Sequence, residues 1–285
     1  MRPVALAFVL ALPLLAGCMS ASDAPVTQAV PQAPAPDLVP LVWQLDTCEA
    51  MEWQILVPAS RLAARMPQGF EPAPTAPAAA APLPDGIEQV GVLGFEAVEC
   101  QRGFSEAETT LRSVPFGRVY TPVIPPKDQS DHRDGAQHAY VWATMVADDE
   151  WRDRLAANGL PVVDGDALVG PSAQGFTGRV AMQGVGSFSL SGRTTADPAP
   201  ARDEPFRDFT AAHDGLAAWI GAREGVRVAN GVGVWEASPE SWVAQVTGMT
   251  SGAATFRLAH WSIPHEAVIR PNDGAEQPFM GPRDD

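Results

Sequence analysis

The sequence predicts a mainly β protein: a single antiparallel barrel-like or sandwich domain with a few covering helices, a β-rich α+β architecture. Segments rich in β-branched and aromatic residues outnumber the segments with helical signals. These strand-like segments do not alternate with helices along the chain, which disfavours a doubly wound α/β sheet. Turn residues separate most of them, as is typical of antiparallel sheets.

Strands are predicted from this composition and from a partial alternation of apolar and polar residues. In chain order, the predicted strands are 52–57, 91–99, 118–123, 138–145, 178–191, 242–249 and 253–263. A hairpin is predicted with strands at 226–229 and 232–235. Its turn would be Asn230 and Gly231, the residue pair that best tolerates the positive φ angles of a type I′ turn.

Helical signals are fewer. A short helix is predicted over 60–66, a longer one over 148–158 that ends at Gly159, and a third over 206–222. These three helices would cover the sheet rather than connect parallel strands.

Both ends of the chain differ in composition from its middle. Residues 18–40 are rich in Ala, Ser, Thr, Gln and Pro and show no apolar periodicity, which predicts a disordered tether. Residues 271–285 are rich in Pro, Gly, Asp and Glu and predict a flexible tail. The predicted globular domain is therefore 41–270.

Residues 1–17 are predicted to be a signal peptide. Arg2 precedes an apolar stretch that is too short to span a membrane, and this stretch ends in Leu15-Ala16-Gly17-Cys18. These four residues resemble the lipobox of bacterial lipoproteins. The resemblance implies cleavage before Cys18, an acyl anchor on its thiol, and an extracytoplasmic lipoprotein that is at the outer membrane or faces the periplasm in a Gram-negative cell. The alternative is an ordinary secretory signal with an incidental cysteine.

The two remaining cysteines, Cys48 and Cys100, form an even pair in a chain that is predicted to be exported. Because exported proteins reach an oxidising compartment, a disulfide is predicted between them. Two buried free thiols or a metal pair are the alternatives. No CxxC motif and no nearby histidine accompanies either cysteine, which disfavours a metal.

The net charge of −15, from 19 basic and 34 acidic residues, argues against nucleic acid as a partner, since phosphate backbones are bound by clustered Lys and Arg. The acidic residues are predicted to form a solvated surface. The membrane, through Cys18, and a small molecule remain as the expected partners.

Candidate ligand-binding residues lie on the predicted strands. His260 opens the densest polar and aromatic cluster and shares a strand face with Phe256 and Leu258, which predicts either a structural role or a place in a cavity wall. Trp142 could line a pocket for an apolar or sugar-like ligand, although large aromatic residues are more often core. The candidate set is Glu96, Trp142, Arg257 and His260. No metal site and no cofactor is predicted, because a strand would point His260 and His265 to opposite faces.

The segment 57–70, Val-Pro-Ala-Ser-Arg-Leu-Ala-Ala-Arg-Met-Pro-Gln-Gly-Phe, resembles the opening of acetoacetate decarboxylase-like proteins. The following segment, Gly-Phe-Glu-Ala at 94–97, resembles a strand that carries a cavity-facing carboxylate in that family. The resemblance implies an acetoacetate decarboxylase-like fold with a cavity, with Glu96, Glu108 and His260 as candidate catalytic residues.

The sequence departs from this family at the lysine on which the family's chemistry depends. The family's chemistry depends on a lysine that forms a Schiff base, and the region where that residue is expected, 145–165, holds only Arg152 and Arg154 as basic residues. Arginine stays protonated and cannot form the imine. The one lysine of the chain, Lys127, lies in a predicted loop. Decarboxylation through an imine is therefore not expected.

Three functions follow as hypotheses. The first is a lipid-anchored protein that binds a small, partly apolar ligand in the cavity of a β-barrel. The second is an acetoacetate decarboxylase-like enzyme, a lyase or hydrolase that uses cavity carboxylates and no Schiff base. The third is an envelope module that binds a protein or a glycan through exposed aromatic residues.

Overall fold

The computed structural model describes residues 41–73, 90–105, 114–127, 136–173, 175–212, 215–261 and 265–271. All of them belong to one unit of the chain, 35–285. The predictions on the signal peptide, on Cys18, on the tether and on Glu108 lie outside the described residues, as does the predicted tail beyond residue 271.

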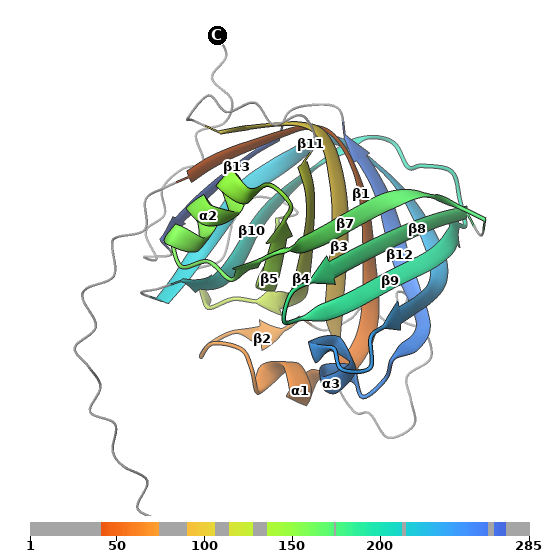
Figure 1. Cartoon of the computed structure of the whole chain (residues 1–285), viewed down its shortest axis with the longest axis horizontal. Coiled ribbons are helices and arrows are strands. Elements are labelled where there is room, and N and C mark those ends of the chain that lie inside the picture. The colour runs from red at the N-terminus through yellow and green to blue at the C-terminus, as the bar shows by residue number, and fades with distance from the viewer. Residues whose placement is uncertain are drawn as a thin grey trace, which may run out of the picture. The chain divides into compact units, whose positions relative to one another are not determined.

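The described part of the chain is dominated by strands, which confirms the mainly β prediction (Figure 1). The strands are β1 (Leu41–Pro58), β2 (Glu71–Pro72), β3 (Val90–Ser105), β4 (Val114–Ile124), β5 (Gln137–Val146), β6 (Val162–Val163), β7 (Gly165–Ser172), β8 (Gly175–Met182), β9 (Gly186–Thr194), β10 (Arg202–Ala212), β11 (Gly215–Ala237), β12 (Ser251–Trp261) and β13 (His265–Pro271). The helices are α1 (Ala59–Ala63), α2 (Asp149–Ala157) and α3 (Trp242–Thr247). No helix of this part of the chain is long and apolar enough to cross a bilayer.

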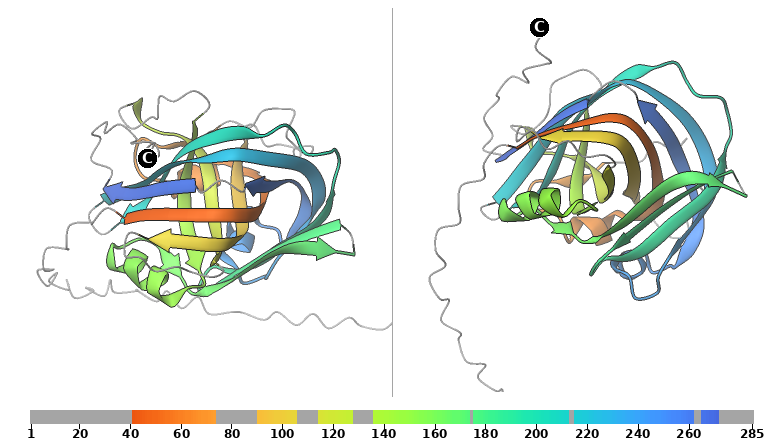
Figure 2. Two further views of the ribbon diagram at one scale, coloured as in Figure 1. Left: turned by 90° about the horizontal axis from the view of Figure 1, so that it is seen from above. Right: turned by 45° about the horizontal axis from the view of Figure 1, so that its top comes forward.

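The strands form one large sheet in the order β10-β5-β4-β3-β1-β12-β11-β9-β8-β7. All pairings are antiparallel except β10 with β5 and β5 with β6. The long strands β1 and β11 bend, as Figure 2 shows from two directions. The first half of β11 pairs with β10 and β13, whereas its second half pairs with β12 and β9.

The sheet curls, but it is not the closed barrel of the first hypothesis. Pairing of β10 with β11 brings the sheet round on itself. Strand β7, however, pairs only with β8 among the described strands, so this edge of the sheet stays free. The lining of the cavity described below comes mainly from β1, β4, β5, β10, β11 and β12, the part of the sheet that curls round, and not from the free edge.

The central strands separate two hydrophobic cores. One core contains the paired cysteines and Trp261, and the other contains Trp53 and Phe95, whose rings stack with centroids 5.5 Å apart. Because successive strand residues point to opposite faces, Glu52 lies on the face of the first core, opposite to Trp53. The charged side chain of Glu52 therefore lies on the face that carries the first core and does not enter the second core.

A disulfide joins Cys48 and Cys100, with the two Sγ atoms 2.06 Å apart, as predicted from the sequence. The two residues lie directly opposite each other in the register of β1 and β3. Both are fully buried in the first core. The disulfide therefore fixes two central strands of the sheet to each other.

The hairpin prediction at 226–235 is wrong, because β11 runs through Asn230 and Gly231 without turning. Both residues keep ladder partners on β12, Arg257 and Phe256. A Cβ atom on Gly231 would stand 2.2 Å from Cζ of Phe256. Glycine is present here to admit an aromatic ring and not to make a turn.

The helix prediction at 206–222 is also wrong. This segment forms most of β10 and the start of β11, which pair as a hairpin from Pro205 opposite Ala222 to Ala212 opposite Gly215. Phe206 packs into the first core and Phe209 into a separate, third core. Because both faces of β10 are covered by a core, apolar residues occur on both of its faces. Their spacing, three residues from Phe206 to Phe209, resembles that of one face of a helix.

The strand prediction at 242–249 is wrong for the opposite reason, because the segment is helix α3. The Ser241 hydroxyl caps it by accepting from the Ala244 backbone N–H at 3.0 Å, and Gly248 ends it at φ 75°. These capping signals outweigh the strand-like composition. The prediction at 178–191 divides into two strands, β8 and β9, around a turn at 183–185.

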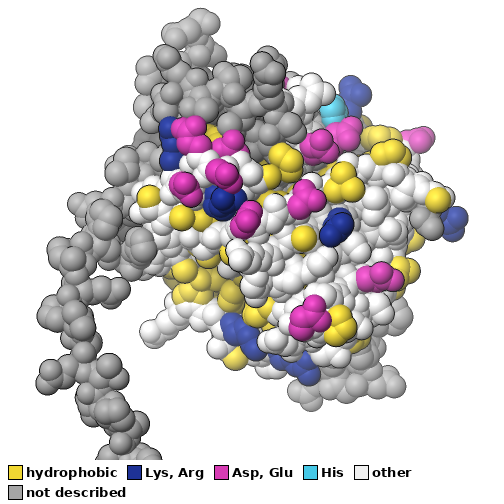
Figure 3. Space-filling model, viewed as in Figure 1, with side chains coloured by type: hydrophobic (Ala, Val, Ile, Leu, Met, Phe, Trp, Pro, Cys, Tyr) yellow, Lys and Arg dark blue, Asp and Glu magenta, His cyan; other side chains and the backbone are white. Residues whose placement is uncertain are grey.

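The other predictions agree with the structure where it describes the chain. Strands 52–57, 91–99, 118–123, 138–145 and 253–261 lie within β1, β3, β4, β5 and β12. Helix α1 overlaps the first part of the predicted helix 60–66 and ends three residues earlier, and α2 matches 148–158, with Asp148 capping its first turn and Gly159 at φ 72° after its end. On the face shown in Figure 3, acidic side chains are spread over α2 and the neighbouring strands.

Candidate functional site

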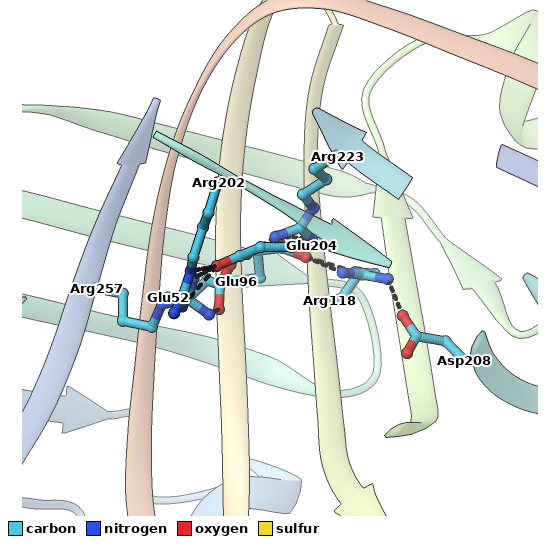
Figure 4. Close-up of polar contacts among 8 residues, drawn as sticks. All are labelled: Glu52, Glu96, Arg118, Arg202, Glu204, Asp208, Arg223 and Arg257. Carbon is cyan, nitrogen blue, oxygen red and sulfur yellow. Dashed lines mark hydrogen bonds and ion pairs between the residues drawn. The ribbon is translucent and has the colours of Figure 1, made fainter. Parts of the chain in front are cut away.

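Eight charged residues form one continuous chain of ion pairs on the face of the sheet that also carries the first core (Figure 4). Acidic and basic residues alternate along it, in the order Asp208, Arg118, Glu96, Arg223, Glu52, Arg257, Glu204 and Arg202. We call these eight residues the charge network. They come from β1, β3, β4, β10, β11 and β12.

Glu96 lies near the centre of the charge network and has no exposed surface, at 0%. Arg118 donates from Nε to Oε2 of Glu96 at 2.5 Å, and Arg223 donates from Nη2 to Oε1 at 2.6 Å. Arg118 also donates to Asp208 Oδ2 at 2.7 Å. Both carboxylate oxygens of Glu96 are thus bonded by arginines.

The other half of the charge network is built around Glu52. Arg223 donates to Glu52 Oε1 at 2.7 Å, and Arg257 donates to Oε2 at 3.3 Å. A second guanidinium nitrogen of Arg257 donates to Glu204 Oε1 at 2.5 Å, and Arg202 donates to the same oxygen at 2.9 Å. Each inner member of the network therefore has two partners of opposite charge, which is what buried charges require.

The electrostatic environment differs along the charge network. Burial alone would raise the pKa of Glu52, but the charges of Arg257 and Arg223 outweigh it and lower this pKa to about 2. Burial raises the pKa of Asp208, and the charge of Arg118 offsets only part of this effect. Asp208, at one end of the network, is therefore protonated more readily than an exposed aspartate.

A cavity of about 320 Å³ lies against the charge network. We call it the network cavity. Among the described residues, three carboxylates and three arginines line it, and the uncharged polar lining residues are Gln54, Tyr120, Gln137 and His138. The remaining lining is mostly apolar: Ala73, Pro122, Val123, Ala136, Ala139 and Phe206. Such a cavity can hold a small molecule through both hydrogen bonds and apolar contacts.

Tyr120 lines the network cavity above β3. Burial raises the pKa of its hydroxyl, and the carboxylates of Glu52 and Glu96 raise it further, while a hydrogen bond with Gln54 acts in the opposite direction. The phenol therefore stays neutral at physiological pH and can both donate and accept a hydrogen bond.

Two predicted site residues belong to the charge network. Arg257 lines the network cavity. Glu96 lies beneath it, bonded to arginines and without exposed surface, so its position is that of a structural anchor for Arg118 and Arg223. The placement of Glu96 does not favour the acid-base role that the enzyme hypothesis gave it.

The other two described candidates lie elsewhere. Trp142 packs against Tyr140 and Trp242 and donates from its indole N–H to the Thr121 hydroxyl at 2.9 Å. His260 is exposed on β12, opposite Glu49 and Arg227, and shares its strand face with Phe256 and Leu258 as predicted. Neither residue lines the network cavity.

No amine from a lysine reaches the network cavity, since the one lysine of the sequence, Lys127, is exposed beyond the end of β4. Among the described residues there is also no group of three or more His, Cys, Asp or Glu side chains arranged to hold a metal ion. The described lining offers hydrogen bonds and apolar contacts to a ligand.

Several members of the charge network were not predicted as site residues from the sequence. Glu52 and Arg118 stand between apolar neighbours in predicted strands, and this interruption of an apolar segment was an available signal. Glu204, Asp208 and Arg223 lie in or beside the segment that was predicted as a helix. In one helix Glu204 and Arg223 would lie about 28 Å apart, whereas the hairpin of β10 and β11 places them directly opposite each other, so the helical assignment hid the site.

No family model matches the chain, and no curated protein does. Several solved structures are similar to it. Acetoacetate decarboxylase from Legionella pneumophila is 11% identical with a TM-score of 0.48, covering 84% of this chain and 90% of that one. The enduracididine biosynthesis enzyme MppR, with HEPES buffer bound, is 12% identical with a TM-score of 0.46, covering 90% and 96%.

A third structure, an acetoacetate decarboxylase-like enzyme from Sphingomonas wittichii, is 14% identical with a TM-score of 0.41 and covers 86% of this chain and 96% of that one. Two of these three proteins carry the name of the family that the sequence resembles. At these identities and TM-scores, what the three proteins bind or catalyse is not transferred to this chain.

Proposed function

We propose that the chain is a lipid-anchored extracytoplasmic protein, attached through Cys18, whose β-rich domain binds a small, partly apolar molecule of no net charge. The observation that carries the binding proposal is the network cavity, which is lined by equal numbers of carboxylates and arginines. The anchor rests on the N-terminal sequence, in which the lipobox-like residues end at Cys18.

The balance of charge around the cavity selects against ions. The lining carboxylates Glu52, Glu204 and Asp208 are each already bonded to arginines. An anion would have to take an arginine from one of them, which would leave a buried carboxylate without its partner. A cation would have the converse effect. A neutral or zwitterionic molecule avoids both costs.

The uncharged lining gives such a molecule its specific contacts. Tyr120 and His138 can provide hydrogen bonds, and Val123 and Phe206 provide apolar contact. A volume of about 320 Å³ matches the lower end of ordinary small-molecule sites. The ligand is therefore small and partly apolar, in agreement with the first sequence hypothesis.

Binding is favoured over catalysis by the arrangement of Glu96. Its burial and its two arginine partners suit a residue that holds other side chains in place. An acid-base catalyst has to come within about 2.6–3.2 Å of the reacting atoms, directly or through one water. Glu96 has no exposed surface and is not among the lining residues of the network cavity, which does not suit this role.

Native mass spectrometry of the full chain, purified in mild detergent from membranes of its own host, tests the proposal. We expect a mass increment that is lost on denaturation, a lower occupancy in Tyr120→Phe, and unchanged occupancy in the matched control Tyr140→Phe, which removes a hydroxyl outside the cavity. An empty wild-type protein, or equal occupancy in the two variants, contradicts the binding proposal.

The anchor is tested in the same samples. We expect the N-terminal peptide to begin at Cys18 with acyl chains, and we expect Cys18→Ala to lack them. A wild-type protein without acyl chains contradicts the anchor and leaves the binding proposal standing.

A further inference from the structure

A second hollow, of about 410 Å³, adjoins the network cavity on the same face of the sheet. The two share Glu52, Gln54 and Arg257 as common walls. Its other lining residues come from the second half of β11, from β12 and from Thr195 after β9. We call it the neutral groove. A ligand held in the network cavity can therefore extend into it without crossing a strand.

The floor of the neutral groove is a regular grid of side chains on β1, β12 and β11. In the strand register, Glu52, Arg257 and Asn230 form one row. Gln54, Thr255 and Val232 form the next row. With strands about 4.8 Å apart and alternate residues about 6.8 Å apart, the grid measures roughly 10 by 7 Å, close to the footprint of one sugar ring.

The chemistry of this grid differs from that of the network cavity. Apart from Glu52 and Arg257, which are paired to each other, none of the described residues that line the groove is charged. Gln54, Thr255 and Asn230 present amide and hydroxyl groups, each of which both donates and accepts hydrogen bonds. Thr195 closes the edge, with its hydroxyl donating to the Asn230 carbonyl at 3.2 Å.

Val232 and Phe256 are the large apolar residues of the described lining. Val232 is 49% exposed, and its face of the strand is the groove, whereas Phe256 is almost fully buried. A surface that combines hydrogen-bonding groups with an exposed apolar side chain matches a ring that has hydroxyls on its edge and C–H bonds on its face.

We propose that the neutral groove is a second subsite, which binds an uncharged, hydroxyl-rich ring such as a sugar, and that the ligand of the network cavity carries this group. The inference rests on the proposed function, since the network cavity holds the other end of the same ligand. It narrows the ligand from a small neutral molecule to a hydroxylated one.

The experiment is saturation-transfer-difference NMR on the full chain in detergent, with methyl β-D-glucoside as the probe. We expect a transfer signal with wild type and a dissociation constant raised about three- to tenfold in Thr255→Val and in Asn230→Ala, from the loss of one hydrogen bond each. Asn230 is exposed, so its variant keeps the test valid if Thr255→Val does not fold. Thr250→Val, an exposed site outside both hollows, should behave as wild type.

Absence of a transfer signal in wild type overturns the second subsite, and so does an unchanged dissociation constant in both groove variants. Either result is distinguishable from failure of the proposed function, which is read from the co-purified mass and its response to Tyr120→Phe. A bound mass with no response to the glucoside would keep the network cavity and remove the neutral groove.

Discussion

Gly94 lies directly beneath the ring of Tyr120, so that a Cβ atom on Gly94 would stand 2.4 Å from Cζ of that ring. The two residues are also direct partners in the register of β3 and β4. The absence of a side chain at residue 94 is therefore what allows the tyrosine to lie flat over the strand and to form a wall of the network cavity.

Gly94→Ala should displace the Tyr120 ring, lowering the free energy of unfolding by about 1–3 kcal/mol, as expected for overpacking. It should also reduce the occupancy of the network cavity. Gly170→Ala is the matched control, because a Cβ atom on this strand glycine would meet nothing within 4 Å and its φ is not positive. Urea denaturation and native mass spectrometry measure the two effects. Equal unfolding free energies in the two variants would show that the ring does not depend on Gly94.

Glu96→Gln should be strongly destabilising, by about 3–5 kcal/mol, since it leaves Arg118 and Arg223 buried without their shared carboxylate. Glu99→Gln, an exposed site on the same strand, should change the unfolding free energy by less than about 0.5 kcal/mol. Chemical denaturation of both variants measures the difference. If Glu96→Gln unfolds like Glu99→Gln, the charge network does not stabilise the fold.

Glu52 predicts a specific loss of stability in acid. Its pKa is lowered from 4.5 to about 2 on folding, so its contribution is present above pH 4.5 and is lost as the pH falls toward 2. The contribution is on the order of 3 kcal/mol. Unfolding free energies measured between pH 6 and pH 2 should fall steeply in wild type and less steeply in Glu52→Gln. Parallel curves for the two proteins would contradict this assignment.

Removal of the disulfide should destabilise the domain. The chain-entropy model gives about 4 kcal/mol for a loop with a sequence separation of 52, so Cys48→Ala combined with Cys100→Ala should lower the unfolding free energy by that order. Because both cysteines are fully buried, dithiothreitol should reduce the folded protein far more slowly than the urea-unfolded one. Mass spectrometry after thiol alkylation follows the reduction. Rapid reduction of the folded protein would place the bond at the surface, against its observed burial.

Local patterns in the sequence predicted the parts of the fold that depend on local physics. The alternation around Trp53 in β1 and the capping residues of α2 act over a few residues, and both elements were found where they were expected. Beyond that range, partner strands decide. Asn230 and Gly231 form no turn because both pair with β12 and Gly231 also pairs with β9, whereas Phe206 and Phe209 imitate a helical period because two different cores cover them.

The site depends even more on distant residues. Arg257 and Glu96 were candidates from the sequence, but nothing local could pair Arg257 with Glu204 or Arg223 with Glu96. Such pairings are decided by which strands meet. The charge network requires the hairpin of β10 and β11, and this segment was predicted from the sequence as a helix over 206–222.

The pairing of Glu52 with Arg257 joins residues that are 205 positions apart, and the remaining network members are distributed between them. Contacts of such long range form slowly, after the loops that separate them have closed. The binding site is therefore a late product of folding, completed only when β12 has joined β1. A nascent chain that has not yet released residue 257 from the ribosome has no complete site, and no fragment shorter than 52–257 can assemble this arrangement.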